Sequence, residues 1–498
     1  MKQFGYLLFA AALAAQSPDM ARVRTDLAHL TAAGMHGRAA LEPGHDAAAK
    51  YVEQGFRDAG LAITVQEFNL FRAFPDAGAS SVAWNGRAIE YRGSFRRDVD
   101  AEAPVVFAGY GITAPEYGYD DYAGLDVKGK IVIVLDREPG EPDRKSPFLG
   151  RGLTVHSASR IKRLNAQRRG ALALLTVSSA HSQAAPGDPN PARGSAHTMH
   201  DAIVEIPQLS LPAESIAVIA PSYREWQNTI DRTYRPASRT IDGTMRIRLV
   251  NREVTAGKGR NVIGVLEGTN QTRKDEPVLI TSHYDHLPDK GSHSYPGAND
   301  NASGTVAVME LARQFAARGK LERPLVFISF GAEENGLLGS YWYAAHPLVP
   351  LAKTLAVLNL DMVARDEAHT IQTRGRLKLR SKTSDVINLV GVAYSPDLAE
   401  LLRRANKATR LRLDEKFDHE SSQNTLWRCD HFPFLVEGVP AVWLFGGWHP
   451  GYHEPVDTMD RLNYTKLGMV IELTAEAARI LASGGGRPQF RSMNERSK

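Results

Sequence analysis

The stretch Leu279-Ile280-Thr281-Ser282-His283-Tyr284-Asp285-His286 begins as an apolar run and ends in imidazole and carboxylate side chains. A short apolar run bounded by a turn signal is typical of a buried strand, which we expect over residues 277–281. His283 leaves the end of that strand. Because open α/β sheets build their sites just beyond the carboxyl ends of their strands, His283 is a candidate site residue.

The same arrangement recurs through the second half of the chain. Apolar runs at 261–266, 324–330, 354–360 and 439–445 predict strands, and the spacing of apolar residues over 301–318, 337–345 and 462–481 predicts helices. Residues 18–60 favour helices and 61–68 a further strand. Alternating strands and helices predict an α/β fold, with a mixed, largely parallel sheet sandwiched by helices.

Four more residues of metal-ligand type lie at or after these runs. Asp300 opens the predicted helix at 301–318, where helix capping is the ordinary role of a carboxylate. Its small neighbours, over 297–304, would also let the backbone approach a crowded centre. Glu334 and Asp361 each follow a predicted strand, and His453 lies in a loop rich in Gly and Pro.

Two imidazoles and three carboxylates suit a pair of zinc ions. With Asp300 bridging, His283 and Asp361 would complete one site, and Glu334 and His453 the other. Glu333 adjoins a ligand and is predicted to be the general base. Two further carboxylates, Asp285 and Asp457, are predicted to accept the second ring N–H of His283 and of His453.

Residues 99–250 differ from the rest of the chain in their pattern of apolar and turn-forming residues. Short β-type runs, an amphipathic segment at 161–170 and a loop at 182–194 predict a separate, mostly-β unit without metal-ligand spacing. Its four histidines, His156, His181, His197 and His200, are expected on the solvated surface. The predicted organisation is therefore a first part at 16–98, the insert at 99–250, the main domain at 251–486 and a frayed tail at 487–498.

Composition limits the classes of function. The chain has 498 residues, 43% of them hydrophobic, and 60 Lys and Arg against 56 Asp and Glu. This near balance, without a basic block that includes aromatic residues, argues against nucleic-acid binding. The sole cysteine, Cys429, cannot form an intrachain disulfide and is expected to be small, buried and inert.

The amino-terminal segment predicts export. Lys2 followed by an apolar run over 4–15 is typical of a signal peptide at 1–15, although a buried amino-terminal helix is the alternative. That run is short for a membrane span, and no later segment has the length of one. We therefore expect a bacterial periplasmic or extracellular protein.

The motifs around the five candidate ligands resemble those of the di-zinc aminopeptidase family, which includes bacterial leucyl aminopeptidases and glutamate carboxypeptidase. The resemblance implies a phosphorylase/hydrolase-like α/β sandwich, two Zn²⁺ ions and release of N-terminal residues from peptides with a free N-terminus. By motif match, it gives Asp300 the bridging role and Glu333 the role of base. The other ligand roles fall to His283, Glu334, Asp361 and His453.

The resemblance extends beyond these motifs. Met35-His36-Gly37-Arg38 is similar to the family's amino-terminal segment, and Gly109-Tyr110-Gly111-Ile112 resembles part of an inserted protease-associated domain. Asp430-His431 is also similar to a family motif but receives no role here. Residues 364–428 do not align with the family and are where substrate selection is least defined.

Several alternatives remain open at this point. A carboxypeptidase or a glutaminyl cyclase would use the same scaffold, although a cyclase needs only one metal. A non-catalytic binding protein would be marked by loss of ligands or base, and all of them are present. A two-metal phosphatase shares the donor set but lacks an evident phosphate-binding Arg or Lys near these motifs. The preferred N-terminal residue and the oligomeric state are not defined by the sequence.

Overall fold

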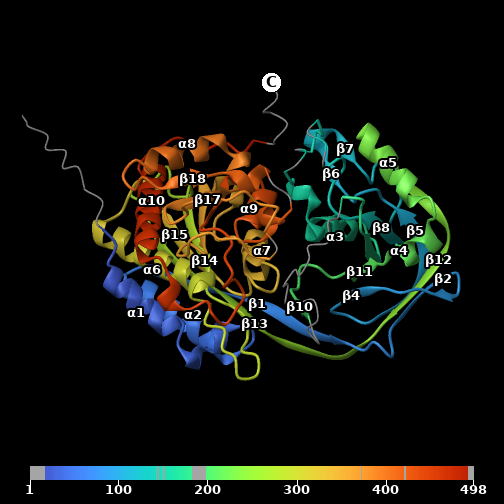
Figure 1. Ribbon diagram of the computed structural model, residues 1–498, viewed down its shortest axis with the longest axis horizontal. Helices are drawn as coiled ribbons and strands as arrows, with labels where there is room; N and C mark the ends of the chain where they lie inside the picture. The colour runs from blue at the N-terminus through green and yellow to red at the C-terminus, as the bar shows by residue number, and fades with distance from the viewer. Residues whose placement is uncertain are drawn as a thin grey trace, which may run out of the picture.

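The computed structural model describes residues 17–491 except 142, 144, 149, 151, 182–197, 372, 420 and 421. The predicted signal peptide, the loop at 182–194, His197 and residues 492–498 lie outside this part. Two large sheets dominate the molecule, each with its own helices (Figure 1). Within the described residues, no helix combines the length and apolar character that a membrane crossing needs.

The first sheet has nine strands in the order β10-β1-β13-β15-β14-β16-β19-β17-β18. Its four central strands, β15, β14, β16 and β19, are parallel. β1 and β13 run antiparallel to their neighbours, and β17 runs antiparallel to β19 but parallel to β18. The prediction of a mixed, largely parallel sheet is confirmed. The strands are β1 (Ala62–Pro75), β10 (Thr198–His200), β13 (Asn251–Leu266), β14 (Val278–His283), β15 (Leu325–Phe330), β16 (Ala356–Asp361), β17 (Val386–Val390), β18 (Arg412–Asp414) and β19 (Ala441–Phe445).

Helices cover both faces of this sheet, as the continuous burial of its central strands requires. One face packs against α1 (Met20–Leu30), α2 (Pro43–Asp58), α6 (Gly304–Arg318), α8 (Pro396–Ala405) and α10 (Tyr464–Ala482). The other packs against α7 (Leu338–Ala345) and α9 (Phe432–Val436). With both faces covered, the carboxyl ends of the parallel strands are where side chains can meet a ligand.

The second sheet has eight strands in the order β3-β2-β12-β5-β8-β9-β11-β4. They are β2 (Ser81–Trp84), β3 (Arg87–Ala88), β4 (Arg92–Ser94), β5 (Val99–Phe107), β8 (Ile131–Leu135), β9 (Ala173–Val177), β11 (Gln208–Leu211) and β12 (Arg239–Leu249), accompanied by α3 (Ser159–Arg168), α4 (Ala213–Ile219) and α5 (Tyr223–Thr233). β2 pairs with β12 and β4 with β11, so this sheet takes strands from before residue 99. We therefore propose that the insert begins near residue 81; that it is a protease-associated domain stays a prediction.

The insert packs directly on the first sheet's layers. Strand β10 from the insert pairs with β1 over Phe71–Ala73. Val155, in the insert, donates its backbone N–H to the Tyr394 hydroxyl at 3.0 Å. Leu153, Val155 and Ile161 belong to the same buried apolar cluster as Phe434 and Trp443. The insert therefore packs on the first sheet's layers through residues 153–161, while its own strands enclose separate apolar clusters.

Two segments differ from expectation. Residues 364–428, which the family pattern does not align, contribute β17, β18 and α8 to the first sheet. The start of the tail, expected to fray, is packed against the body: Phe490 stacks on Tyr394 with ring centroids 5.4 Å apart, and Arg491 donates its N–H to the Tyr394 carbonyl. The aromatic ring at position 490 supplies the apolar contact that holds this part of the tail.

Candidate metal centre

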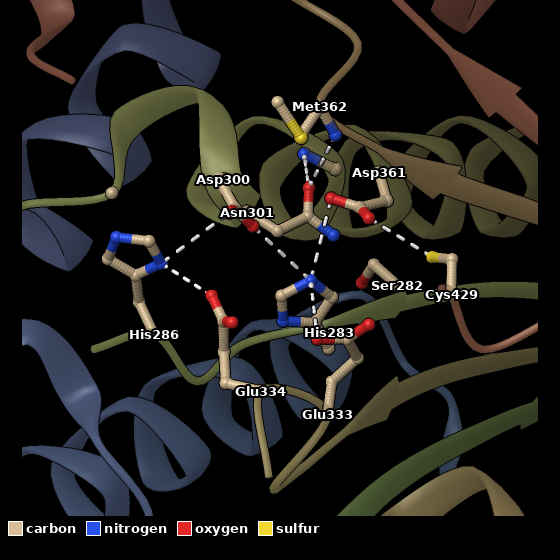
Figure 2. Close-up of polar contacts among 12 residues, drawn as sticks. Ser282, His283, His286, Asp300, Asn301, Glu333, Glu334, Asp361, Met362 and Cys429 are labelled. Atoms are coloured by element: carbon tan, nitrogen blue, oxygen red, sulfur yellow. Dashed lines mark hydrogen bonds and ion pairs between the residues drawn. The ribbon is translucent and has the colours of Figure 1, made fainter. Parts of the chain in front are cut away.

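Four parallel strands deliver the candidate ligands to one edge of the first sheet. His283 ends β14 and Asp361 ends β16. Glu333 and Glu334 follow β15, and the loop after β19 carries His453. Because parallel strands end at the same edge, side chains far apart in sequence converge there (Figure 2).

The five residues form two groups that share Asp300. In the first, His283 Nε2 lies 3.6 Å from Asp300 Oδ1 and 3.5 Å from Asp361 Oδ1. In the second, His453 Nε2 lies 3.2 Å from Asp300 Oδ2 and 3.0 Å from Glu334 Oε2. Asp300 thus presents one oxygen to each group. All the predicted ligands are brought together.

The donor set fits metal ions, because several of its atoms are buried without a hydrogen bond. His283 Nε2, Asp361 Oδ1 and both ring nitrogens of His453 make none within the described part of the chain. Buried polar atoms are normally satisfied, so converging nitrogen and oxygen atoms without a hydrogen bond fit a cation site. Imidazole and carboxylate donors suit zinc.

The consecutive residues Glu333 and Glu334 are in contrasting electrostatic surroundings. Burial raises the pKa of Glu333 well above its usual value, and the nearby charge of Glu334 adds to the shift although His283 opposes it. Burial also opposes ionisation of Glu334, but the imidazoles of His453 and His286 outweigh it and hold the Glu334 pKa well below its usual value. Glu334 is thus the better anionic ligand, and Glu333 the better proton acceptor and donor.

Left-handed backbone aims several of these side chains. Ala332, before Glu333, has φ +61°, Met362, after Asp361, has φ +54°, and His453 itself has φ +57°. Non-glycine residues rarely adopt this region, and such strain clusters at functional sites. The backbone at Gly304 also lies very close to β16. A Cβ on Gly304 would lie 2.1 Å from the Leu360 carbonyl oxygen, so only glycine fits at this position.

The two carboxylates predicted as histidine partners both accept backbone N–H groups. Asp285 accepts from Glu333 at 3.1 Å and Glu334 at 3.3 Å, and its Oδ1 also lies 3.6 Å from His283 Nδ1, whose nearer partner is the Asp285 carbonyl oxygen at 3.1 Å. Asp457 Oδ2 accepts the N–H groups of Asn299 and Asp300, both at 2.9 Å, rather than that of His453. Short turns present free N–H groups, and these are stronger competitors for a buried carboxylate.

Three residues near the centre were not assigned a role by the sequence. His286 Nδ1 lies 2.8 Å from Glu334 Oε1, and Cys429 Sγ donates to Asp361 Oδ2 at 3.0 Å. Asp430 is fully buried, and burial raises its pKa to about 7. The available signals were the nearness of His286 to His283 in sequence and the Asp430-His431 motif. Cys429 is buried as expected, but it touches a candidate ligand.

A cavity of about 680 Å³ opens on this centre. Glu333, Glu334, His286 and His453 line one side, and the insert supplies Arg160, Arg163, His200 and Asp201 on another. His200 was expected on the solvated surface but is buried, and burial together with Arg163 lowers its pKa to about 4. The insert therefore contributes a wall to the cavity next to the candidate metal centre.

Comparison with known proteins agrees with this site. Residues 261–478 match the family model described as peptidase family M28. The chain is 26% identical to the probable lipoprotein aminopeptidase LpqL of Mycobacterium tuberculosis, over 94% of this chain and 87% of that protein. It is 25% identical to aminopeptidase YwaD of Bacillus subtilis, over 86% and 77% of the two chains.

A solved structure shares the whole architecture. The aminopeptidase from Aneurinibacillus sp. strain AM-1 aligns with a TM-score of 0.52 and 23% identity, covering 96% of both chains. At this identity, the likeness bears on the fold. The donor set and the similarity to named aminopeptidases together identify a metallo-exopeptidase. The match to the model of peptidase family M28 covers residues 261–478, which include the five candidate ligands and Glu333.

Proposed function

We propose that this chain is a secreted di-zinc aminopeptidase that removes N-terminal residues from peptides. The observation that carries the proposal is the position of Asp300, whose Oδ1 lies 3.6 Å from His283 and Oδ2 3.2 Å from His453. A carboxylate with one oxygen for each of two ligand groups suits a bridge between two cations. The similarity to LpqL and YwaD, both named as aminopeptidases, supports the substrate class.

His283 and Asp361 would hold one ion with Asp300, and Glu334 and His453 the other. Three protein ligands per ion leave a position open for water or substrate, as in catalytic zinc sites. When bound, such a pair supplies a water of lowered pKa and a Lewis acid for the peptide carbonyl. Because the five side chains come from strand ends and loops that the sheet brings to one edge, the fold holds them in place before any ligand arrives.

Glu333 would move the proton. The residue is 8% exposed, and its Oε2 lies 3.8 Å from His283 Nε2, beside the first ligand group and on the cavity wall. In this role, Glu333 accepts a proton from the attacking water and returns it to the leaving amine. The side chain touches the cavity, so it meets the substrate without having to change its place in the fold.

Asp285 and Asp457 would act through the backbone. Asp285 fixes the turn that carries Glu333 and Glu334, and Asp457 fixes the amides of Asn299 and Asp300. Both carboxylates are fully buried. Holding two ligand-bearing turns by charge-assisted hydrogen bonds keeps the donors within reach of each other.

Metal analysis combined with a substrate panel tests this proposal. The purified protein should contain about two zinc ions per chain, hydrolyse aminoacyl chromogenic amides, lose that activity with a chelator, and leave the matching N-acetylated amides intact. Activity on blocked peptides would instead indicate a carboxypeptidase or an endopeptidase. A chain without metal and without turnover would contradict the proposal and favour a binding protein.

A further inference from the structure

The two carboxylates that belong to only one ligand group, Asp361 and Glu334, are each held at both oxygens. One oxygen faces a histidine of the group: Asp361 Oδ1 lies 3.5 Å from His283 Nε2, and Glu334 Oε2 lies 3.0 Å from His453 Nε2. The opposite oxygen of each carboxylate is met by a buried side chain outside the proposed ligand set (Figure 2). The two halves of the centre are therefore built alike.

The buried side chain that meets the second oxygen of Asp361 is Cys429. Its Sγ lies 3.0 Å from Asp361 Oδ2, and the side chain is fully buried. The Asn359 amide donates to the same sulfur at 3.0 Å, and Asn359 Oδ1 in turn accepts from Thr281 at 2.7 Å. Since the sulfur already accepts a hydrogen bond from Asn359, its own proton is directed at Asp361. This chain of contacts begins inside β14 and ends on a ligand.

The buried side chain that meets the second oxygen of Glu334 is His286. Its Nδ1 lies 2.8 Å from Glu334 Oε1, and its ring is packed so closely against Gly297 that a Cβ there would be 2.5 Å from His286 Cδ2. A carboxylate oxygen accepts, so Nδ1 carries the proton in this contact. Glycine at position 297 thus leaves room for the ring, which packs against the backbone there while its Nδ1 faces Glu334 Oε1.

We propose that Cys429 and His286 are paired positioning residues that keep Asp361 and Glu334 bound to metal through one oxygen each. A donor on the second oxygen competes with the metal for it. The carboxylate then remains monodentate, and the coordination position it would otherwise take stays open for water or substrate. The orphaned atoms His283 Nε2 and Asp361 Oδ1 mark the side on which the ion sits. This inference rests on the proposed two-metal function.

Four substitutions test it in the full chain loaded with Co²⁺, whose visible spectrum reports coordination number. Cys429→Ala and His286→Ala remove the donors, whereas Cys429→Ser and His286→Asn keep one at nearly the same place. We expect each alanine variant to bind Co²⁺ at one site roughly 10- to 100-fold more weakly. Its d–d absorption should also weaken, as the freed oxygen joins the metal. The conservative variants should restore most of both properties.

Ser329→Ala is the matched control. Ser329 is fully buried in β15 and hydrogen-bonds Ser282 at 3.0 Å without touching a ligand side chain, so its loss should change neither Co²⁺ affinity nor spectrum. If Cys429→Ala fails to fold, Cys429→Val fills the volume of the thiol without a donor and repeats the measurement.

The outcomes separate this inference from the proposed function. Alanine variants that match Ser329→Ala in affinity and spectrum would overturn the inference, while a wild-type chain that binds two ions would leave the function intact. Loss of a whole ion in His286→Asn as well as His286→Ala would make His286 a ligand and overturn its positioning role. A wild-type chain that binds no metal would overturn the function itself.

Discussion

Glu333 and Glu334 are neighbours in the chain, yet their carboxylates point into different surroundings. Glu334 lies between the imidazoles of His286 and His453, whereas Glu333 is buried near Asp361 and Asp430. Pairs of titratable groups whose environments push their pKa values apart are typical of acid–base sites. The proposed ligand and the proposed base are thus consecutive residues in different electrostatic surroundings.

Replacing Glu333 with Gln should remove most turnover and leave the metal in place. The amide keeps the size of the side chain but accepts no proton, so we expect kcat to fall by about 10²–10⁴-fold. Zinc analysis and steady-state kinetics on one preparation measure both quantities. Glu400→Gln, on the exposed surface of α8, is the control and should behave as wild type. Full activity in Glu333→Gln would remove Glu333 from the mechanism.

His453→Ala should weaken the binding of only one of the two proposed zinc ions. His453 contacts Asp300 Oδ2 and Glu334 Oε2, the oxygens of the second ligand group. The first group, His283 and Asp361 with Asp300 Oδ1, keeps its donors when His453 is replaced. Metal analysis after dialysis should therefore give about half of the wild-type zinc content, since a site that loses one of three protein ligands binds weakly. A stoichiometry equal to wild type would contradict the ligand role of His453.

At the scale of elements, the sequence predicted what depends on local patterning. The apolar runs at 277–281, 324–330, 354–360 and 439–445 lie within or overlap β14, β15, β16 and β19, because fully buried strands must be apolar throughout. The ligands at their ends followed from the same logic. The short strands β17 and β18 were not predicted, because β18 has only three residues and its pairing comes from β17.

Contacts between loops could not be predicted from the sequence. The meeting of His286 with Glu334, and of Asp457 with the amides of Asn299 and Asp300, joins segments brought together only when the sheet forms. Nothing in the local sequence distinguishes a carboxylate that binds an imidazole from one that binds backbone. Asp285 therefore lies beside His283 as predicted but also holds backbone, whereas Asp457 holds backbone N–H groups rather than the ring of His453.

The 3₁₀ segment η1 (Ala33–Arg38) is expected to be essential for stability through Arg38. This fully buried guanidinium donates to the carbonyl groups of Tyr284 at 2.8 Å, Leu30 at 2.6 Å, Pro296 at 2.8 Å and Gly297 at 3.2 Å. It thereby ties the segments after His283 and before Asp300 to the amino-terminal helices.

Arg38→Ala would leave those carbonyl oxygens without donors, so we expect the free energy of unfolding to fall by about 3 kcal/mol. Urea denaturation followed by circular dichroism measures it. Arg22→Ala, which removes an ion pair with Asp26 in α1 from an arginine that is 50% exposed, should cost less than about 1 kcal/mol. Equal losses in the two variants would contradict the structural role given to Arg38.

At the scale of the whole molecule, the buried contact between the insert and the first sheet's layers predicts cooperative unfolding. Leu153, Val155 and Ile161 of the insert are buried with residues of β19 and α9, so separating the insert would expose part of that apolar cluster. Scanning calorimetry of the metal-loaded chain should therefore give one transition. Two separated transitions, or a stable fragment after limited proteolysis between the sheets, would mean that the insert folds independently.

The insert should also make stability depend on pH. Burial raises the pKa of Glu138 from about 4.5 to about 8, although Thr154 donates hydrogen bonds to it. Between these values, the folded chain keeps a proton that the unfolded chain has lost, so this group's contribution to stability falls as the pH rises from about 4.5 to about 8. Glu138→Gln, which cannot ionise, should be more stable relative to wild type at pH 8.5 than at pH 5. Urea midpoints at both pH values measure this, and an unchanged difference would contradict it.

The pairing of β1 with β13 joins two strands that the ribosome makes at widely separated times. Ala62 pairs with Val265 and Phe74 with Glu253, so β1 emerges from the ribosome with the whole insert still to be made. At ordinary rates of translation, about 5–20 residues per second, roughly 10–40 s separate the two strands. For most of that time β1 has no strand partner, because β10 pairs only with Phe71–Ala73 and is itself made late. We expect this amino-terminal strand to be the segment most in need of a chaperone while the chain is being synthesised.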